Sequence, residues 1–329
     1  MSRVKLAVLV ISTLLFVSAG PALNPSVSIA SEKKTEKKKK ALRGTPVLWR
    51  SPGNITARNL YWGAGGQRMK PDLRRVTFLK EEKGGYSRKY RVRDASGRIW
   101  VTKLSKESQP ETAANRLMWA VGYVTEIDYL APHVEIAGKG TYKNVRFEAR
   151  PANIDRADAW EWDQNPFLGT REFQGLKVMM ALLNNWDIKD SNNKIFVVNG
   201  RSGTELRYVI SDLGATFGSS RSTPILWTIT RSRNEPVKYA KANFVDKVKS
   251  RNVRFHYGGK RNSLFKDVTV EDAWWIGRLL SRLRDQQIRD AFRAANYTPG
   301  EIELLTREVR IRINELVNIR PTEQLGHRR

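Results

Sequence analysis

Three residues in one stretch of the chain could hold a hard divalent cation. Asp187 and Asn192 lie five positions apart in a polar loop, and Asp212 starts an Asp-Leu-Gly turn further along. Oxygen ligands without His or Cys suit Mg²⁺ or Mn²⁺, hard cations that usually act together with phosphates. The three side chains can share this chemistry only if the chain brings them together.

A β-hairpin is expected between these residues. β-prone runs at 194–198 and 206–210 flank a Gly-containing turn. In an antiparallel pair, the start of the first strand lies beside the end of the second. We therefore expect Asn192 and Asp212 to be neighbours, with Asp187 close by on the loop.

Two further candidate residues stand on elements expected ahead of this loop. β-prone runs on either side of a polar turn at 94–97 predict another hairpin, whose second strand carries Lys103 at its end. Apolar residues at helical spacing then predict a helix that opens at Ser108 and stops at Gly122. Glu111 lies in its first turn, where Ser108-x-x-Glu111 is also a capping-box pattern.

Together these motifs resemble the catalytic core of the protein-kinase-like superfamily. In that superfamily an Asp five residues before an Asn lies on the catalytic loop, and a hairpin leads to a metal-binding Asp followed by x-Gly. The Trp-Asp start and the Asp-Leu-Gly-x-x-Phe-Gly ending are closer to atypical branches than to ordinary Ser/Thr kinases. Those branches are the secretory-pathway Fam20-like, spore-coat CotH, HipA-type and phosphatidylinositol kinases. The resemblance covers roughly residues 84–218, and the loop lacks a His-Arg-Asp motif.

The resemblance implies a role for each residue of the polar loop and the turn. Asp187 would be the catalytic base or would orient the acceptor hydroxyl, and Asn192 and Asp212 would hold the divalent ions that bridge the phosphates of ATP. ATP with Mg²⁺ or Mn²⁺ is therefore the expected cofactor pair. Without the resemblance, Asp187 could instead cap a helix or form an Asx-turn in a polar loop.

The resemblance also implies how the phosphates would be held. Lys103 would contact the α- and β-phosphates with Glu111 as its ion-pair partner, and Gly84 and Gly85 would form a turn that covers the phosphates. The alternatives stay open at this point. Lys103 could be an exposed strand residue, and capping through Ser108 explains Glu111 completely.

The fold class expected is α+β, with the two lobes of a protein-kinase-like fold. A β-rich N-lobe would span 44–165, and a mainly helical C-lobe would span 166–329 and carry the catalytic loop and the metal-binding hairpin. Further β-like segments are expected at 123–130 and 144–149. Periodic apolar residues predict helices at 171–184, 270–284, 285–295 and 299–317.

The composition excludes other kinds of site. The 329 residues include no Cys, so disulfides, thiolate nucleophiles, iron–sulfur clusters and Cys-ligated zinc are ruled out. The three His residues lie far apart in sequence, which disfavours a His-rich metal site or a Ser-His-Asp triad.

The first 43 residues predict export. A short basic start, an apolar run from Leu6 to Ala19 and small residues near Ala30 are typical of a signal peptide over 1–30, and a retained anchor is the minority interpretation. A lysine-rich segment at 31–43 predicts a disordered tail, either a plain linker or a tether to an anionic surface. The mature protein is expected to be periplasmic or extracellular, either soluble or surface-associated, with no membrane span after signal cleavage.

The net charge of +26 bears on the partner. Subtracting +2 for the basic start and +5 for the lysine-rich segment leaves +19 on residues 44–329. The leading hypothesis is an exported kinase-like enzyme that transfers the ATP γ-phosphate to a hydroxyl on an acidic protein or other polymer. The alternatives are transfer of AMP, a nucleotide-binding pseudokinase, or a non-catalytic basic module for nucleic acid, polysaccharide or anionic lipid. Nucleic acid is not favoured, because the tryptophans lie in apolar-periodic segments.

Overall fold

The computed structural model describes residues 42–84, 87–222 and 229–319. The predicted signal peptide, Gly85 and all but the last two residues of the lysine-rich segment lie outside the described residues. Within the described residues, no helix combines the length and the apolar character that crossing a membrane requires.

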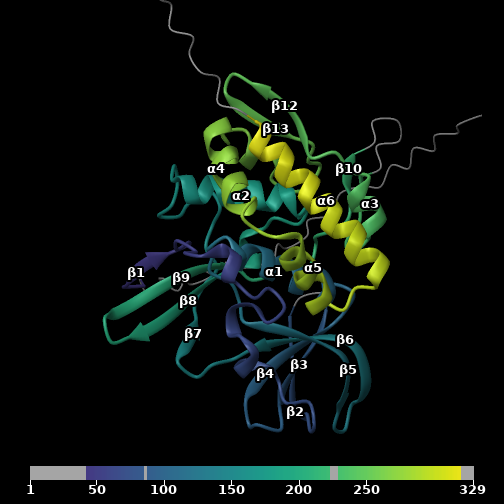
Figure 1. Cartoon of the computed structure of the whole chain (residues 1–329). Coiled ribbons are helices and arrows are strands. Elements are labelled where there is room, and N and C mark those ends of the chain that lie inside the picture. Colours follow the sequence, from purple (N-terminus) through teal and green to yellow (C-terminus); the bar gives the residue numbers. More distant parts are fainter. Residues whose placement is uncertain (1–41, 85–86, 223–228, 320–329) are drawn as a thin grey trace, which may run out of the picture. The chain divides into compact units, whose positions relative to one another are not determined.

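A five-stranded antiparallel sheet forms the first half of the fold (Figure 1). Its strand order is β2-β3-β4-β6-β5, with the bounds Thr77–Glu82 for β2, Arg88–Arg93 for β3, Ile99–Leu104 for β4, Asp128–Ile136 for β5 and Gly140–Ala149 for β6. The predicted hairpin with Lys103 is confirmed as β3–β4. Its turn is fixed by Asp94, whose carboxylate accepts hydrogen bonds from the backbone N–H groups of Ser96 and Arg98 and from the indole of Trp100.

Helix α1 (Ser108–Ala120) connects the third and fourth strands of the sheet in chain order. Ala114, Leu117, Met118 and Val121 are buried, as the helical spacing predicts, and Ala113 is buried beside them. The two alanines let the helix backbone lie close to its neighbours, and α1 contacts both β5 and β6. This close packing sets where the acidic first turn of the helix comes to lie.

A second sheet of four strands contains the predicted metal-site hairpin. Its order is β1-β9-β8-β7, with the bounds Thr45–Val47 for β1, Ile154–Arg156 for β7, Asn193–Gly200 for β8 and Gly203–Ile210 for β9. The hairpin β8–β9 is confirmed, with Asn193 opposite Ile210 at its open end. Strand β1 pairs in parallel with β9, a long-range contact that no local pattern indicates.

Helices dominate the second half, as expected, and all four predicted helices are present with slightly different ends. They are α2 (Arg171–Leu182), α4 (Val270–Leu280), α5 (Asp285–Ala294) and α6 (Pro299–Asn318). Thr170 caps α2, and capping boxes start α4 and α6. In Figure 1, α2, α4 and α6 lie together at the opposite end of the described region from the five-stranded sheet.

The helical half also contains short elements that the sequence analysis missed. They are the strand pairs β10 (Ser220–Ser222) with β11 (Ile229–Arg231) and β12 (Val245–Lys249) with β13 (Asn252–Phe255), the short helix α3 (Pro236–Ala240), and single 3₁₀ turns. The turns in this half span Asp190–Asn192 and Asn262–Phe265, and three further 3₁₀ turns precede the five-stranded sheet, at Ile55–Ala57, Gly63–Gly65 and Gln67–Met69.

Buried apolar side chains form two clusters. One lies on the five-stranded sheet around Trp100 and Phe147, and the other runs through α1, α2, α4, α5 and α6. A sheet with its own small core followed by a helical region with a larger one confirms the expected α+β class, with a β-rich first half and a mainly helical second half.

Candidate active site

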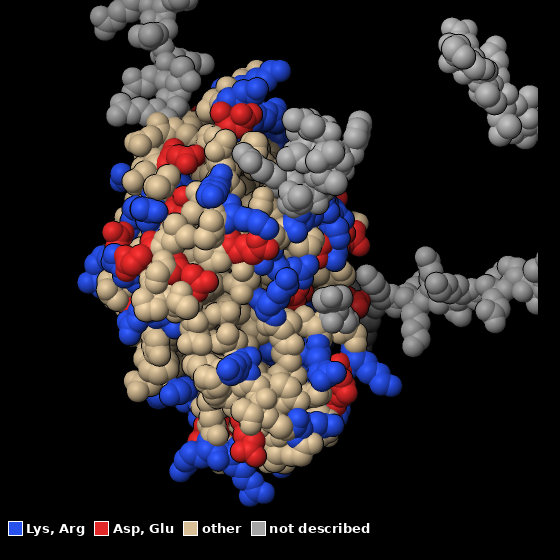
Figure 2. Space-filling view, turned by 90° about the vertical axis from the view of Figure 1, so that its right-hand side faces the viewer, with Lys and Arg blue, Asp and Glu red and all other residues tan. Residues whose placement is uncertain are grey.

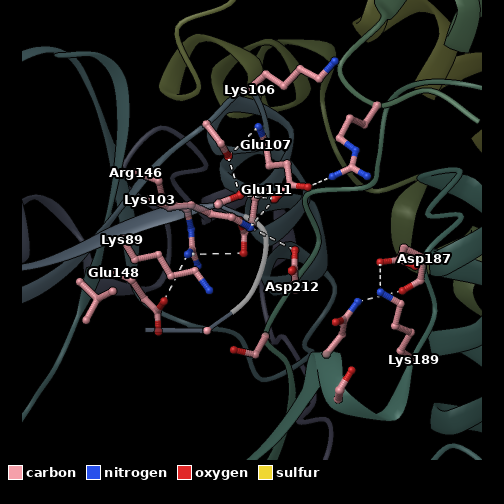
Figure 3. Close-up of a pocket in the computed structure, with 18 of the residues that line it drawn as sticks. Lys89, Lys103, Lys106, Glu107, Glu111, Arg146, Glu148, Asp187, Lys189 and Asp212 are labelled. Carbon is pink, nitrogen blue, oxygen red and sulfur yellow. Dashed lines mark hydrogen bonds and ion pairs between the residues drawn. The ribbon is translucent and has the colours of Figure 1, made fainter. Parts of the chain in front are cut away.

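Lys103 is buried and contacts three carboxylates. Its Nζ lies 2.9 Å from Glu111 Oε2, 2.9 Å from Glu107 Oε2 and 3.2 Å from Asp212 Oδ1, and its side chain is 5% exposed. Burial acts to lower the pKa of this ammonium, but Glu111 and Asp212 outweigh it and raise the pKa. Lys103 is therefore not an exposed strand residue, and it ties β4, α1 and the turn after β9 together (Figure 3).

Glu111 makes the ion pair and not the capping box. Helix α1 already begins at Ser108, whose hydroxyl donates to the carbonyl of Lys103 at 2.8 Å, so Ser108 is not in the position of a cap. Glu111 contacts Lys103 through one oxygen and Arg146 through the other, at 3.4 Å. Burial raises the pKa of Glu111 to about 7, against the opposing effect of the two cations.

Asp212 lies in the turn after β9 and contacts Lys103 directly. Its Oδ1 also accepts a hydrogen bond from the backbone N–H of Gly214 at 3.1 Å. Burial acts to raise the pKa of Asp212, but Lys103 and the Gly214 N–H outweigh it and lower the pKa. A side chain at Gly214 would lie 2.7 Å from Glu107 Cβ, so the glycine lets this turn approach α1.

The hairpin places Asn192 beside Asp212 as predicted. The carbonyl of Asn192 accepts hydrogen bonds from the backbone N–H groups of Ser211 at 2.7 Å and Asp212 at 3.2 Å. The side-chain amide of Asn192 donates to the carbonyl of Asp187 at 2.8 Å, which fixes the loop that carries Asp187. This bond uses the amide nitrogen and leaves the amide oxygen, the atom that a divalent cation takes as a ligand.

Asp187 lies on another wall of the same pocket, held by two lysines. Its Oδ2 is 2.7 Å from Lys189 Nζ, and its Oδ1 is 2.7 Å from Lys260 Nζ. Figure 3 shows Asp187 and Lys189 facing each other, at a distance from the cluster of Lys103, Glu107, Glu111 and Asp212. The neighbouring Asp190 and Asn193 are structural, because they bond to the backbones of Trp162 and Trp160.

Gly84 also lines the pocket. It follows β2, in the connection to β3, and its φ of +105° is a conformation that favours glycine. This is the place where a turn that covers phosphates was expected.

The donor set fits a divalent cation bound together with phosphate. Among the described residues, no three His, Cys, Asp or Glu side chains converge on a metal-sized site. Asn192 can offer its amide oxygen and Asp212 its carboxylate. A cation held by these two groups would complete its coordination shell with phosphate oxygens and water, as Mg²⁺ commonly does.

A buried charge network behind Lys103 was missed by sequence reasoning. Arg146 on β6 is fully buried and contacts four carboxylates: Glu111 at 3.4 Å, Glu126 at 2.6 Å, Asp128 at 2.7 Å and Glu148 at 3.2 Å. The available signal was the pair Arg146 and Glu148, two positions apart on a strand and thus on one face. The network fixes Glu111 from the side opposite Lys103.

The lysines that hold Asp187 were missed as well. Lys189 lies two residues after Asp187, and Lys260 comes from the loop after β13. The Gly-containing basic loop was visible in the sequence, but no local pattern indicated that it would reach the loop that carries Asp187.

These residues line one large cavity of about 1020 Å³. Elements of both halves of the fold contribute to its walls. The lining has twelve basic side chains against six acidic ones, and few apolar groups. The basic ones are Lys83, Lys89, Lys103, Lys106, Arg146, Arg150, Arg156, Lys189, Lys194, Arg231, Arg233 and Lys260, and the acidic ones are Glu107, Glu111, Glu148, Asp187, Asp212 and Glu235.

Comparison with known proteins finds similarity among solved structures only. No protein-family model matches the chain, and no curated protein matches its sequence. The fold is similar to the proinflammatory kinase CtkA of Helicobacter pylori, with 12% identity, a TM-score of 0.46, and coverage of 74% of this chain and 94% of that one. It is also similar to the Rio2 kinase of Chaetomium thermophilum, solved as an ADP/Mg²⁺-phosphoaspartate complex, with 12% identity, a TM-score of 0.31, and coverage of 75% and 74%. Both neighbours are kinases, and the similarity is too low to assign roles to residues of this chain by correspondence.

Proposed function

We propose that this protein is a kinase-like phosphotransferase that binds ATP with Mg²⁺ or Mn²⁺ and transfers the γ-phosphate to an acceptor hydroxyl. One observation carries the proposal: a single buried ammonium, Lys103, contacts both Glu111 on α1 and Asp212 beside the hairpin. Phosphoryl transfer requires this combination of a positioned cation and oxygen ligands for a metal, and needs little other chemistry from the protein.

Each residue has a defined part in this proposal. Lys103, oriented by Glu111, binds the α- and β-phosphates, and Asp212 with Asn192 holds the divalent ion. The ion, when bound, neutralises charge on the transferring phosphate. Asp187 receives a hydrogen bond from the acceptor hydroxyl, which aims its oxygen at the γ-phosphorus. The new O–P bond forms as the bond to the β-phosphate oxygen breaks, and the hydroxyl proton leaves through Asp187.

The lysines at Asp187 support an orienting role for this carboxylate. Each of its oxygens lies 2.7 Å from a lysine Nζ, and these two ion pairs favour one orientation of the carboxylate. A fixed group lowers the cost of aligning the acceptor.

Labelling with γ-phosphate-labelled ATP tests the proposal, with casein and histone as an acidic and a basic acceptor and the protein itself as a third. We expect divalent-metal-dependent labelling that falls at least about a hundredfold in Asp187→Asn. The matched control is Asp246→Asn on β12, an exposed aspartate away from the cavity, which should label normally. Equal labelling by Asp187→Asn and the wild type would contradict the assignment.

A non-catalytic basic module is the second candidate, favoured by the net charge of +26 and the excess of basic side chains in the cavity. On the face shown in Figure 2, however, basic side chains are interspersed with acidic ones and form no continuous stripe. Binding of heparin or polyphosphate that weakens steeply with salt, without any response to ATP, would support the module.

Export is part of the proposal and rests on the sequence of residues 1–30 alone. Fusing these residues to a periplasmic reporter enzyme tests it. Reporter activity that appears only with the intact apolar run supports export, and activity retained after the run is deleted contradicts it.

A further inference from the structure

The loop after β13 is docked on the catalytic loop at three points. The hydroxyl of Tyr257 donates to the carbonyl of Asn185 at 2.6 Å, and the backbone N–H of Lys260 donates to the carbonyl of Trp186 at 2.8 Å. The third point is the ion pair of Lys260 with Asp187. A residue from a remote segment is thereby held at the carboxylate that faces the acceptor.

Gly259 makes this docking geometrically feasible. A Cβ at this position would lie 2.7 Å from Trp186 Cα and 2.1 Å from the hydroxyl of Tyr257. Real Cβ atoms do not approach backbone that closely, so the loop can reach the catalytic loop only with glycine here.

Arg231, at the end of β11, adds a second cation next to the same loop. Its guanidinium lies 5.7 Å from the ring centroid of Trp186, and its Nη2 donates to the carbonyl of Gly258 at 3.4 Å. Among the described residues, no carboxylate pairs with it, and its buried Nε has no hydrogen-bond partner. Because this Nε is enclosed by protein, an anion in the cavity would be held by the terminal N–H groups of the Arg231 guanidinium, since Arg231 lines the cavity.

The charges around Asp187 do not cancel. Lys189 and Lys260 both pair with the single carboxylate of Asp187, and Arg231 adds a third positive charge to this wall of the cavity without a carboxylate partner among the described residues. Glu235 also lines the cavity, but it pairs with Lys238 at 2.5 Å. The wall beside Asp187 therefore has an uncompensated positive charge.

We propose that Arg231, Lys260 and Lys189 form an anion-binding subsite beside Asp187, which selects acceptors that carry a phosphate or carboxylate close to the reacting hydroxyl. This inference rests on the proposed function, since it names the chemistry of the acceptor for that same site. The planar guanidinium of Arg231 provides the directed contact, and the two lysines provide charge.

Binding of short fluorescent peptides in the absence of nucleotide tests the subsite. The peptides contain one serine and differ only at its neighbour, which is phosphoserine, glutamate or lysine. At about 0.15 M salt we expect the phosphoserine and glutamate peptides to bind and the lysine peptide not to bind. The two acidic arms distinguish a phosphate requirement from a general preference for anions.

Three variants locate the binding. Arg231→Gln and Lys260→Gln should each weaken binding of the acidic peptides about tenfold or more, and Arg231→Lys should restore part of the loss. Lys247→Gln, at an exposed position on β12, is the matched control and should bind normally. Thermal melts establish that each variant is folded. If Arg231→Gln does not fold, Lys260→Gln and Arg231→Lys still test the subsite.

Several outcomes would overturn the subsite. The first two are equal binding of all three peptides and binding of none of them. The third is unchanged binding in Arg231→Gln and Lys260→Gln. The fourth is loss of binding only in Lys103→Met, which would place the anion in the inner part of the cavity. Because nucleotide is absent, this result is independent of the proposed function. A protein that binds acidic peptides as expected but does not respond to ATP would retain the subsite and lose the phosphotransferase assignment.

Discussion

Lys103 and Glu111 form a buried ion pair, with Nζ 2.9 Å from Oε2, although one residue lies on β4 and the other on α1. The two side chains are 5% and 1% exposed. The same ammonium reaches Asp212, so this pair connects the sheet, the helix and the turn after the hairpin. Because both side chains are buried, replacing either one should change the free energy of unfolding as well as the activity.

Replacing Lys103 with Met should destabilise the protein by about 3–5 kcal/mol, because it leaves buried carboxylates without their shared cation. Adding Glu111→Gln should recover part of this loss, since it removes one of the uncompensated charges. Urea unfolding of the two single variants and the double variant measures the coupling. Additive losses would mean that the two residues do not interact in solution.

Glu111→Gln should also remove a pH dependence of stability. The folded-state pKa of Glu111, about 7, lies above its ordinary value of 4.5, because burial disfavours the charged form. The contribution of Glu111 to stability is thus fully present below about pH 4.5 and is lost as the pH rises through about 7, by up to about 3 kcal/mol. The free energy of unfolding of the wild type minus that of Glu111→Gln should fall over this range. A difference that stays constant or rises would contradict the assignment.

Arg146→Met should destabilise the protein at least as much as Lys103→Met, because Arg146 faces four buried carboxylates. The matched control is Arg91→Met on β3, whose ion pair with Glu82 is partly exposed and should cost at most about 1 kcal/mol. Denaturant midpoints compare the two. Similar losses for both variants would show that the network around Arg146 contributes no more than a surface pair.

Gly259→Ala should reduce phosphate transfer at least about tenfold without loss of ATP binding, because it displaces the loop that holds Asp187 through Lys260. Gly300→Ala is the control, since a Cβ there meets no atom within 4 Å. Labelling rates and ATP-induced thermal shifts separate the two effects. Unchanged transfer in Gly259→Ala would exclude a role for the docked loop.

Much of the fold was predictable because its signals are local. The turn at Asp94, the alternation around it and the apolar periodicity of α2, α4 and α6 each lie within one segment. The β8–β9 hairpin was predictable for the same reason, and it brought Asn192 and Asp212 together. Glu111 was ambiguous, because a capping box and an ion pair use the same residue, and only the position of α1 against β4 separates them.

The rest of the site depends on contacts between distant segments. Arg146 contacts Glu111 and Glu126 only because β6 pairs with β4 beneath α1. Lys260 reaches Asp187 only because Gly259 lets a loop from a distant part of the sequence pack closely against Trp186. Strand β1 likewise pairs with β9, although the two strands lie far apart in the sequence. No periodicity or local spacing encodes such juxtapositions, so sequence reasoning found the metal-ligand candidates and missed the cations around them.

The most direct test of the central claim is the thermal shift caused by ATP with and without Mg²⁺. For the wild type we predict an increase in melting temperature that requires both ATP and Mg²⁺, because a ligand that binds only the folded state stabilises it by mass action, by about 2.7 kcal/mol at a hundred times its dissociation constant. In Asp212→Asn the increase should disappear, while Asp246→Asn should retain it. An ATP response that is absent in the wild type, or unchanged in Asp212→Asn, would contradict the account.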